Sequence, residues 1–432
     1  MSETIDSRSW RQRVAVSALR LCVGAVFAFS GFVKAVDPYG SYYKITEYLH
    51  ALGWESLLGL ALFGAVMLAA VEFALGVMTI TGTHRRVTPL LMLLLLLVMT
   101  PLTLWLAVTD MVKDCGCFGD AWHMSNTATF VKNVVLLVGV VLLLKYNKRV
   151  VGVYSPVVHW FVTMLALSLP LAVSYVGYFI QPGIDFRPYP VGTHLVPTGT
   201  EPDDSDYLFT YERDGVRQDF SIDSLPDDED GWIYVERRVA GPAIKADSDA
   251  ESFTLRDVKT VADVSADVLT DTADVILLLF PNLTTVSAAH TYSLNRLTDI
   301  AHADSVAVAG VTGAGEHEIE MWGDISMADY TMYRADDSDV KMLARGNPAV
   351  VFVHRGRIVW KSTLSWLESI DAFDGSVPLV RLGDKINVDD MVGWLFFTWL
   401  TLMTVLAILN RVPVFLMRCL ARGREQQGET VA

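Results

Sequence analysis

Six long apolar stretches constrain this chain more than any other feature. A helix needs about 20 apolar residues to cross a bilayer, and backbone in lipid must satisfy its own hydrogen bonds. Of the 432 residues, 52% are hydrophobic, which is typical of a largely membrane-embedded protein. The sequence therefore predicts an α-helical membrane bundle with six spans, at residues 14–36, 57–80, 87–108, 130–144, 157–180 and 391–409. An aromatic loop between the first two spans, which includes Tyr39, Tyr42, Tyr43, Tyr48 and Trp54, suits a membrane interface.

The first apolar stretch has one alternative interpretation. Ala28-Phe29-Ser30 could serve as the small-residue cleavage site of a secretory signal peptide. The stretch is longer than the usual signal core of about 7 to 15 residues, so a retained span is favoured.

Positive charges predict the orientation of the spans. Lys and Arg accumulate on the cytoplasmic side of membrane proteins. If every stretch crosses, all four basic clusters fall on one side, so both termini are cytoplasmic and residues 181–390 are extracytoplasmic. The clusters are Arg8, Arg11 and Arg13; Arg85 and Arg86; Lys145, Lys148 and Arg149; and Arg411, Arg418, Arg422 and Arg424.

The net charge of −15 argues against a nucleic-acid partner, since such proteins need basic surfaces to neutralise phosphate. The acidic excess is concentrated in residues 201–274, with 21 acidic and seven basic residues. A solvated acidic surface is the simplest interpretation of this block.

The second half of the chain alternates between strand and helix patterns. Residues 275–280 read as a buried strand, residues 286–301 as a helix and residues 305–311 as a strand, before an apolar hairpin at residues 349–361. Such alternation predicts an α/β domain. Upstream, residues 207–211 and 231–236 look like short strands, with a turn at Asp214-Gly215. The predicted domains are residues 1–180, 181–252, 253–388 and 389–432.

The α/β pattern resembles the thioredoxin fold. Pro348 stands where that fold places a cis-proline before its final hairpin, but the position of the redox motif reads Pro281-Asn282-Leu283-Thr284, without cysteine. The resemblance thus implies a redox-silent thioredoxin-like domain, used for binding or as a spacer.

Two of the four cysteines, Cys115 and Cys117, lie one residue apart in the sequence Asp-Cys-Gly-Cys-Phe-Gly-Asp at residues 114–120. Their loop falls between two spans on the side predicted to be oxidising, where disulfides form and persist. A thiolate is the reactive form of cysteine and needs nearby positive charge. The predicted topology places Lys34, Lys113 and Lys132 at about the same depth in the membrane as the two cysteines.

Three interpretations of the pair remain open. Cys115 and Cys117 could exchange disulfides, and the strain of a short disulfide ring, made possible by Gly116, favours exchange over a structural role. They could instead be two unconnected thiols in a turn. A partial metal site with Asp114, Asp120 and His123 is the weakest alternative, because no second Cys or His pair accompanies them. Cys22 and Cys419 lie in or beside apolar helices and read as packing residues.

Two ionisable residues fall inside predicted spans, where charge is costly and often functional. Counted from the cytoplasmic ends, Arg20 and Glu72 lie at similar depths, roughly 10 to 12 Å inward at 1.5 Å per residue. The sequence therefore predicts an Arg20–Glu72 ion pair between the first two spans, with proton relay or quinone chemistry as the alternative.

The chain also resembles a known family of membrane proteins over nearly its whole length. The first two spans, with Arg20, Ser30-Gly31, Lys34 and Glu72, are similar to DoxX-type membrane proteins. The Cys-Gly-Cys loop resembles the related MauE branch, together with residues that follow it, namely Asn126 and Lys132-Asn133. The resemblance implies a bacterial inner-membrane protein, fused to a thioredoxin-like domain and associated with redox reactions or disulfide formation in exported proteins.

Together these features predict that Cys115 and Cys117 exchange electrons with an extracytoplasmic protein thiol or disulfide, with a membrane quinone as a possible second reactant. The rival hypothesis is a non-catalytic assembly or maturation factor that acts through its soluble domain. A small-molecule transporter is disfavoured, because apart from Arg20 and Glu72 the spans offer few polar residues to line a path.

Overall fold

A computed structural model describes residues 2–109, 111, 116–150, 152–195, 207–213, 216–221, 232–239, 253–270, 272–374, 377–386 and 388–429. The chain divides into two compact units. The helical unit comprises residues 1–187, 344–349 and 362–432, and the α/β unit comprises residues 188–343 and 350–361. This combination of a helical bundle and an α/β domain confirms the predicted fold class.

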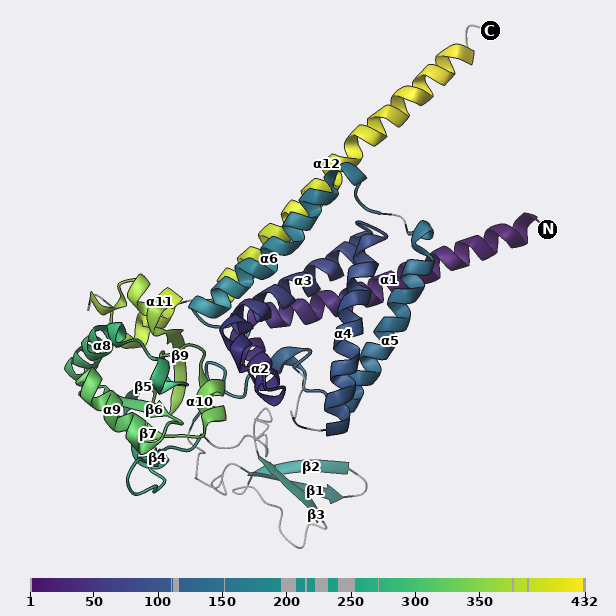
Figure 1. Cartoon of the computed structure of the whole chain (residues 1–432). Coiled ribbons are helices and arrows are strands. Elements are labelled where there is room, and N and C mark those ends of the chain that lie inside the picture. The colour runs from purple at the N-terminus through teal and green to yellow at the C-terminus, as the bar shows by residue number, and fades with distance from the viewer. Residues whose placement is uncertain are drawn as a thin grey trace. The chain divides into compact units, whose positions relative to one another are not determined.

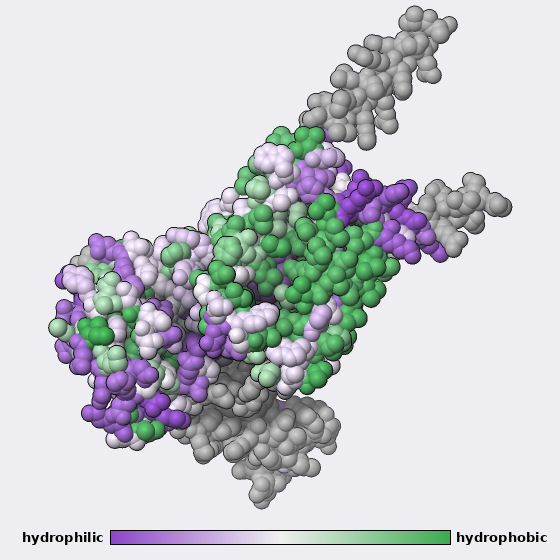
Figure 2. Space-filling model, viewed as in Figure 1, coloured by the Kyte–Doolittle hydropathy of each residue, from purple (hydrophilic) through white to green (hydrophobic). Residues whose placement is uncertain are grey.

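Six helical segments of the described chain are long and apolar enough to cross a membrane, which confirms the predicted number of spans. Apolar side chains cover much of the visible face of this unit (Figure 2). The helices are α1 (Ser2–Val36), α3 (Ala61–Thr81), α4 (Val87–Thr109), α5 (Asn126–Lys145), α6 (His159–Phe179) and α12 (Val388–Glu429). Helix α3 is preceded by a 3-10 segment, η1 (Glu55–Leu60).

Helices α1 and α3 pack side by side over much of their length (Figure 1). Glycines permit this approach: a Cβ on Gly76 would lie 2.7 Å from the Cα of Ala28, and one on Gly31 would lie 2.7 Å from the Ala69 carbonyl oxygen. Small residues at a helix interface let the backbones come close in a membrane, where packing rather than the hydrophobic effect holds helices together.

The aromatic segment after α1 is a helix, α2 (Pro38–Ala51), rather than the loop expected from its composition. The side chain of Asp37 caps this helix by accepting a hydrogen bond from the Gly40 backbone at 2.9 Å, and Pro38 occupies the first helical position. Asp followed by Pro is a standard helix start. The sequence therefore contained a helix-start signal at Asp37-Pro38, but the many tyrosines that follow favoured an interfacial loop as the interpretation.

The α/β unit contains a six-stranded mixed sheet in the order β4-β7-β6-β5-β8-β9. Its central strands, β5 (Asp274–Phe280) and β6 (Ala307–Thr312), pair in parallel, and β7 (Thr331–Arg334) continues the parallel register. The edge strand β4 (Arg256–Asp257) is antiparallel to β7. The remaining strands are β8 (Ala349–His354) and β9 (Arg357–Thr363).

Helices of the same unit accompany this sheet, as the alternating pattern predicted: α7 (Ser265–Val268), α8 (Thr291–Ala303), α9 (Glu316–Ser326) and α10 (Asp337–Leu343). Helix α11 (Leu364–Ser369) follows β9 and belongs to the helical unit. The hairpin between β8 and β9 turns at Arg355 and Gly356, which both have positive φ. Such a turn matches the right-handed twist of the strands.

A second, three-stranded antiparallel sheet has the order β2-β1-β3. It consists of β1 (Tyr207–Arg213), β2 (Val216–Ser221) and β3 (Ile233–Val239). Two of these strands overlap the segments predicted from sequence. The expected turn residues, Asp214 and Gly215, lie outside the described residues.

Residues 344–349 belong to a different compact unit from their neighbours in the sequence. They belong to the helical unit, although they follow α10 and lead into β8 of the other unit. The Asn347–Pro348 peptide bond within this segment is cis, the configuration expected at Pro348.

The α1–α3 interface predicts opposite effects for one substitution at two glycines of α3. Gly76→Ala should lower the free energy of unfolding by about 1 to 3 kcal/mol, because its Cβ would press on α1. Gly64→Ala is the matched control, since a Cβ at Gly64 meets nothing within 4 Å; it should be neutral or stabilising by about 0.5 to 1 kcal/mol, the helix-propensity difference. Thermal unfolding in detergent measures both. Equal effects at the two sites would contradict close packing at Gly76.

Candidate functional site

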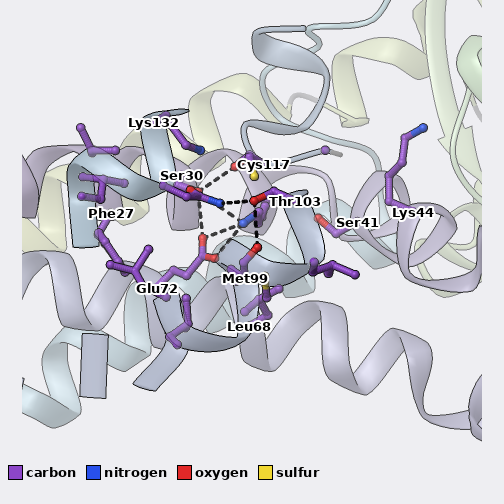
Figure 3. Close-up of a pocket in the computed structure, with 18 of the residues that line it drawn as sticks. Phe27, Ser30, Ser41, Lys44, Leu68, Glu72, Met99, Thr103, Cys117 and Lys132 are labelled. Carbon is purple, nitrogen blue, oxygen red and sulfur yellow. Dashed lines mark hydrogen bonds and ion pairs between the residues drawn. The ribbon is translucent and has the colours of Figure 1, made fainter. Parts of the chain in front are cut away.

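A cavity of about 260 Å³ lies between the helices of the helical unit. Its wall is largely aliphatic, with a small group of polar residues converging on one part of it (Figure 3). The polar lining residues include Ser30, Lys34, Glu72, Thr103, Cys117, Lys132 and Asn133, and the apolar ones include Leu68, Leu95, Leu96, Leu102, Leu106 and Leu136. An apolar cavity with a few convergent polar groups is the usual form of a small-molecule site.

An ion pair between Lys34 and Glu72 forms the charged part of this wall. The Lys34 Nζ lies 2.7 Å from Glu72 Oε2, and the two side chains are only 8% and 7% exposed. A charge so deeply buried needs a partner, because desolvation is costly. The pair joins α1 to α3 through side chains far apart in the sequence.

The predicted Arg20–Glu72 ion pair is wrong. Arg20 lies against Gly82, whose Cβ position would be 2.7 Å from Arg20 Nη1. Gly82 comes ten residues after Glu72, or roughly 15 Å along a helix. The prediction assumed that the apolar stretches end at the same level, whereas α1 and α3 pack with Gly24 beside Ile80. That offset brings Lys34 to Glu72.

Ser30 connects the ion pair to the cysteine loop. Its hydroxyl lies 2.8 Å from Glu72 Oε2 and 2.7 Å from the Cys117 carbonyl oxygen, and it accepts a hydrogen bond from Lys34 at 3.3 Å. A hydroxyl has one proton to donate, so the two acceptors share or compete for it. Any change in the charge of Glu72 would therefore change the hydrogen bond that Ser30 donates to the Cys117 carbonyl oxygen.

The described part of the loop begins at Gly116. Gly116 and Gly119 both have positive φ, which glycine adopts without the steric cost of a Cβ. This agrees with the tight turn predicted from the sequence. Cys117 is half-buried and lines the cavity. The predicted site residues Lys113, Asp114 and Cys115 lie outside the described residues.

Two of the predicted cations are brought to this loop, and a third was missed. Lys34 lines the cavity beside Cys117, and the ammonium of Lys132 lies 4.4 Å from the centre of the Phe118 ring. The aliphatic stem of Lys44, on α2, covers Gly116, with Lys44 Cγ 3.0 Å from the Cβ position of that glycine. Lys44 was missed because its segment was read as a loop. Of these three lysines, Lys34 pairs with Glu72, and Lys44 pairs with Glu47 on its own helix at 3.2 Å.

The other end of the loop is held by a second buried charge cluster. The Arg345 guanidinium lies 2.6 Å from Asp37 Oδ2 and 2.9 Å from Asp120 Oδ2. Burial alone would raise the pKa of Asp37, but the guanidinium groups of Arg345 and Arg187 outweigh it and lower that pKa below its ordinary value. Burial, and then the nearby charge of Asp37, raises the pKa of Asp120 despite Arg345.

Sequence reasoning singled out neither Asp37 nor Arg345. The helix-start signal before Pro38 could have identified Asp37 as a cap, but its pairing joins residues 308 positions apart. No local pattern predicts such a pairing. Asp120, a predicted supporting residue, is engaged with Arg345. Within the described chain no group of three or more His, Cys, Asp or Glu side chains is arranged to hold a metal ion.

The fold and the cavity define a multi-pass membrane protein with an α/β domain inserted between its fifth and sixth apolar helices. Residues 12–146 match the family described as Methylamine utilisation protein MauE. This range contains most of the first apolar helix, the next three apolar helices and every residue lining the cavity. Residues 205–240, which contain β1 to β3, match a domain of unknown function, DUF8463. No curated protein and no solved structure gives a significant match.

The Lys34–Glu72 pair predicts a non-additive stability effect. Glu72→Leu should lower the free energy of unfolding by about 3 to 5 kcal/mol, because it leaves the Lys34 ammonium buried without its partner. Lys34→Met with Glu72→Leu should cost much less, since no charge is then left buried. Thermal unfolding of both single variants and the double variant in detergent gives the coupling. Additive losses would show that the two side chains do not depend on one another.

Proposed function

We propose that Cys115 and Cys117 exchange disulfides with a protein thiol or disulfide outside the cytoplasm. The observation that carries the proposal is the setting of Cys117, which lines an intramembrane cavity together with Lys34, Lys44 and Lys132. Positive charge and partial exposure are the conditions that stabilise a reactive thiolate. Gly116 and Gly119 add the backbone freedom that a two-cysteine loop needs.

The reaction follows ordinary thiol chemistry. One thiolate attacks the disulfide of the partner and forms a mixed disulfide, and the second cysteine then attacks that bond. The partner leaves as a dithiol, and Cys115 and Cys117 become joined. Two electrons and two protons have passed to the partner, and the reverse sequence oxidises the partner instead.

We place this exchange on the extracytoplasmic face of a bacterial inner membrane. The support is the distribution of Lys and Arg, which gathers at the ends of the helices opposite to the cysteine loop. Both termini are then cytoplasmic, and residues 181–390 are extracytoplasmic. The α/β unit, which contains no cysteine, would recruit or position the partner as a thioredoxin-like domain does.

A membrane quinone is the second reactant we propose for the pair. Support comes from the cavity, whose aliphatic wall suits a lipophilic ring and whose polar groups lie beside Cys117. A quinone takes up the two electrons and two protons that a dithiol releases on oxidation. Lys34 and Ser30 would supply hydrogen-bond donors to a quinone carbonyl from the polar part of the wall.

A maturation factor without thiol chemistry is the rival proposal. It is favoured by the α/β unit, which is large, folded and devoid of cysteine and so fits a role in binding alone. In that case the cysteine pair would be structural.

Trapping of the mixed disulfide separates the two proposals. In a Cys117→Ser variant the resolving thiol is gone, so a covalent partner should accumulate on Cys115; in Cys115→Ser it should accumulate on Cys117. Non-reducing gel electrophoresis of acid-quenched cells followed by mass spectrometry measures it. Cys22→Ser, which leaves the pair intact, is the matched control and should accumulate nothing. A lack of thiol-dependent adducts in both variants would support the non-catalytic factor.

Filling the cavity tests the quinone step. Leu102→Trp projects bulk from the cavity wall and should slow oxidation of the reduced pair by a short-chain quinone about tenfold or more, because loss of reactant positioning has effects of this size. Leu104→Trp is the matched control, two residues away on α4, where the side chain is 45% exposed. It should leave the rate unchanged. The rate of thiol loss after quinone addition is the measurement, and equal rates in the two variants would argue against the cavity as the quinone site.

A further inference from the structure

Arg345 occupies an unusual position for a charged side chain. It is 2% exposed, among the largest fully buried side chains of the described chain, and it contacts two carboxylates from different elements. Asp37 caps α2, and Asp120 lies in the 3-10 segment η2 (Gly119–Ala121) that closes the cysteine loop. One guanidinium thus joins the end of the first span to the loop between the third and fourth spans.

Hydrogen bonds with Gln181 also fix the backbone of Arg345. The Arg345 amide donates to Gln181 Oε1 at 3.0 Å, and the Gln181 amide group donates back to the Arg345 carbonyl oxygen. Gln181 lies two residues after the last residue of α6. Residues 344–349 are therefore fixed to the helical unit by backbone and side chain, while the chain on both sides of them belongs to the α/β unit.

Two hydrogen-bonded contacts of the described part of the cysteine loop bear on its position. At Cys117 the backbone carbonyl accepts a hydrogen bond from Ser30. At Asp120 the carboxylate binds Arg345, three residues further along. Turn hydrogen bonds make the short intervening segment compact, with the Gly119 amide donating to the Gly116 carbonyl at 3.1 Å and the Ala121 amide donating to the Phe118 carbonyl at 3.2 Å. A shift of Asp120 would therefore be transmitted to Cys117.

We propose that Arg345 is a positioning residue for the thiol site: through Asp120 it holds the Cys115–Cys117 loop where exchange can occur. Arg345 belongs to the helical unit, although its neighbours in the sequence belong to the α/β unit. This inference rests on the proposed function. It assigns Arg345 and Asp120 to positioning of the cysteine loop, and it assigns Asp37 to support of α2.

Several charged groups surround Asp120, and together they predict how pH affects its ion pair with Arg345. Arg345 and Asp37 contact the same cluster, while Arg187, which is paired with Asp185, and His123 act on it electrostatically. Because burial and the charge of Asp37 raise the pKa of Asp120, this carboxyl is the first of the two to protonate as pH falls. Its ion pair to Arg345 is complete above its pKa and weakens below it. Exchange that depends on the pair should therefore decline toward acid pH.

The test compares two carboxyl variants that each remove one contact of the same guanidinium. In full-length protein in detergent, the rate of exchange of the reduced Cys115–Cys117 pair with Ellman's disulfide is measured from pH 8 down to the lowest pH at which wild type stays folded. Asp120→Asn should be about tenfold slower than wild type at neutral pH, since small misplacements of reacting groups cost that much or more. The deficit should shrink toward acid pH, where wild type also loses the pair. Asp37→Asn, which leaves the loop attached to Arg345, should stay within about twofold.

Arg345 is tested by Arg345→Lys, which retains the charge, and Arg345→Gln, which removes it. The Lys variant should recover part of the rate lost in the Gln variant, with thermal unfolding showing that each variant compared is folded. Equal slowing in Asp37→Asn and Asp120→Asn, or a deficit independent of pH, would show a purely structural cluster and overturn the inference. Wild-type protein that does not exchange with the probe at all would instead refute the proposed function.

Discussion

The close approach of α1 and α3 is the constraint on which the rest of the helical unit depends. Glycines at Gly31 and Gly76 remove the side chains that would keep the two backbones apart. The resulting register places Lys34 against Glu72 and Ser30 between that pair and Cys117. An ammonium and a carboxylate buried in this way are stable only together, so the register and the ion pair reinforce one another. The polar part of the cavity is a consequence of helix packing.

The cysteine loop is attached to this framework at two points of different chemistry. Ser30 binds the backbone of Cys117 with a neutral hydroxyl, and Arg345 binds the side chain of Asp120 with a charge. The first attachment comes from a membrane helix. The second comes from a short segment whose neighbours in sequence form the α/β unit.

Some features were predictable because their causes are local. Six spans follow from the length of apolar stretches, and the α/β sheet follows from the alternation of strand and helix patterns. The glycine turns at Gly116 and Gly119 agree with expectations drawn from residue type, and the cis bond at Pro348 agrees with the position that the fold resemblance implied. The Arg20–Glu72 pair failed because depth was counted from the ends of apolar stretches. These ends do not lie at the same level along the two helices. The offset of a few helical turns places Lys34, rather than Arg20, opposite Glu72.

Composition, periodicity and spacing within short windows of the sequence were enough to predict the membrane bundle and the α/β domain and to single out Cys115 and Cys117. Which charges meet depends instead on the tertiary fold. The Lys34–Glu72 pair depends on the register of two helices, and the Arg345 contacts to Asp37 and Asp120 span 308 and 225 residues. Such pairings are fixed by the packing of distant segments, because a buried charge accepts whichever partner the backbone brings within hydrogen-bonding distance.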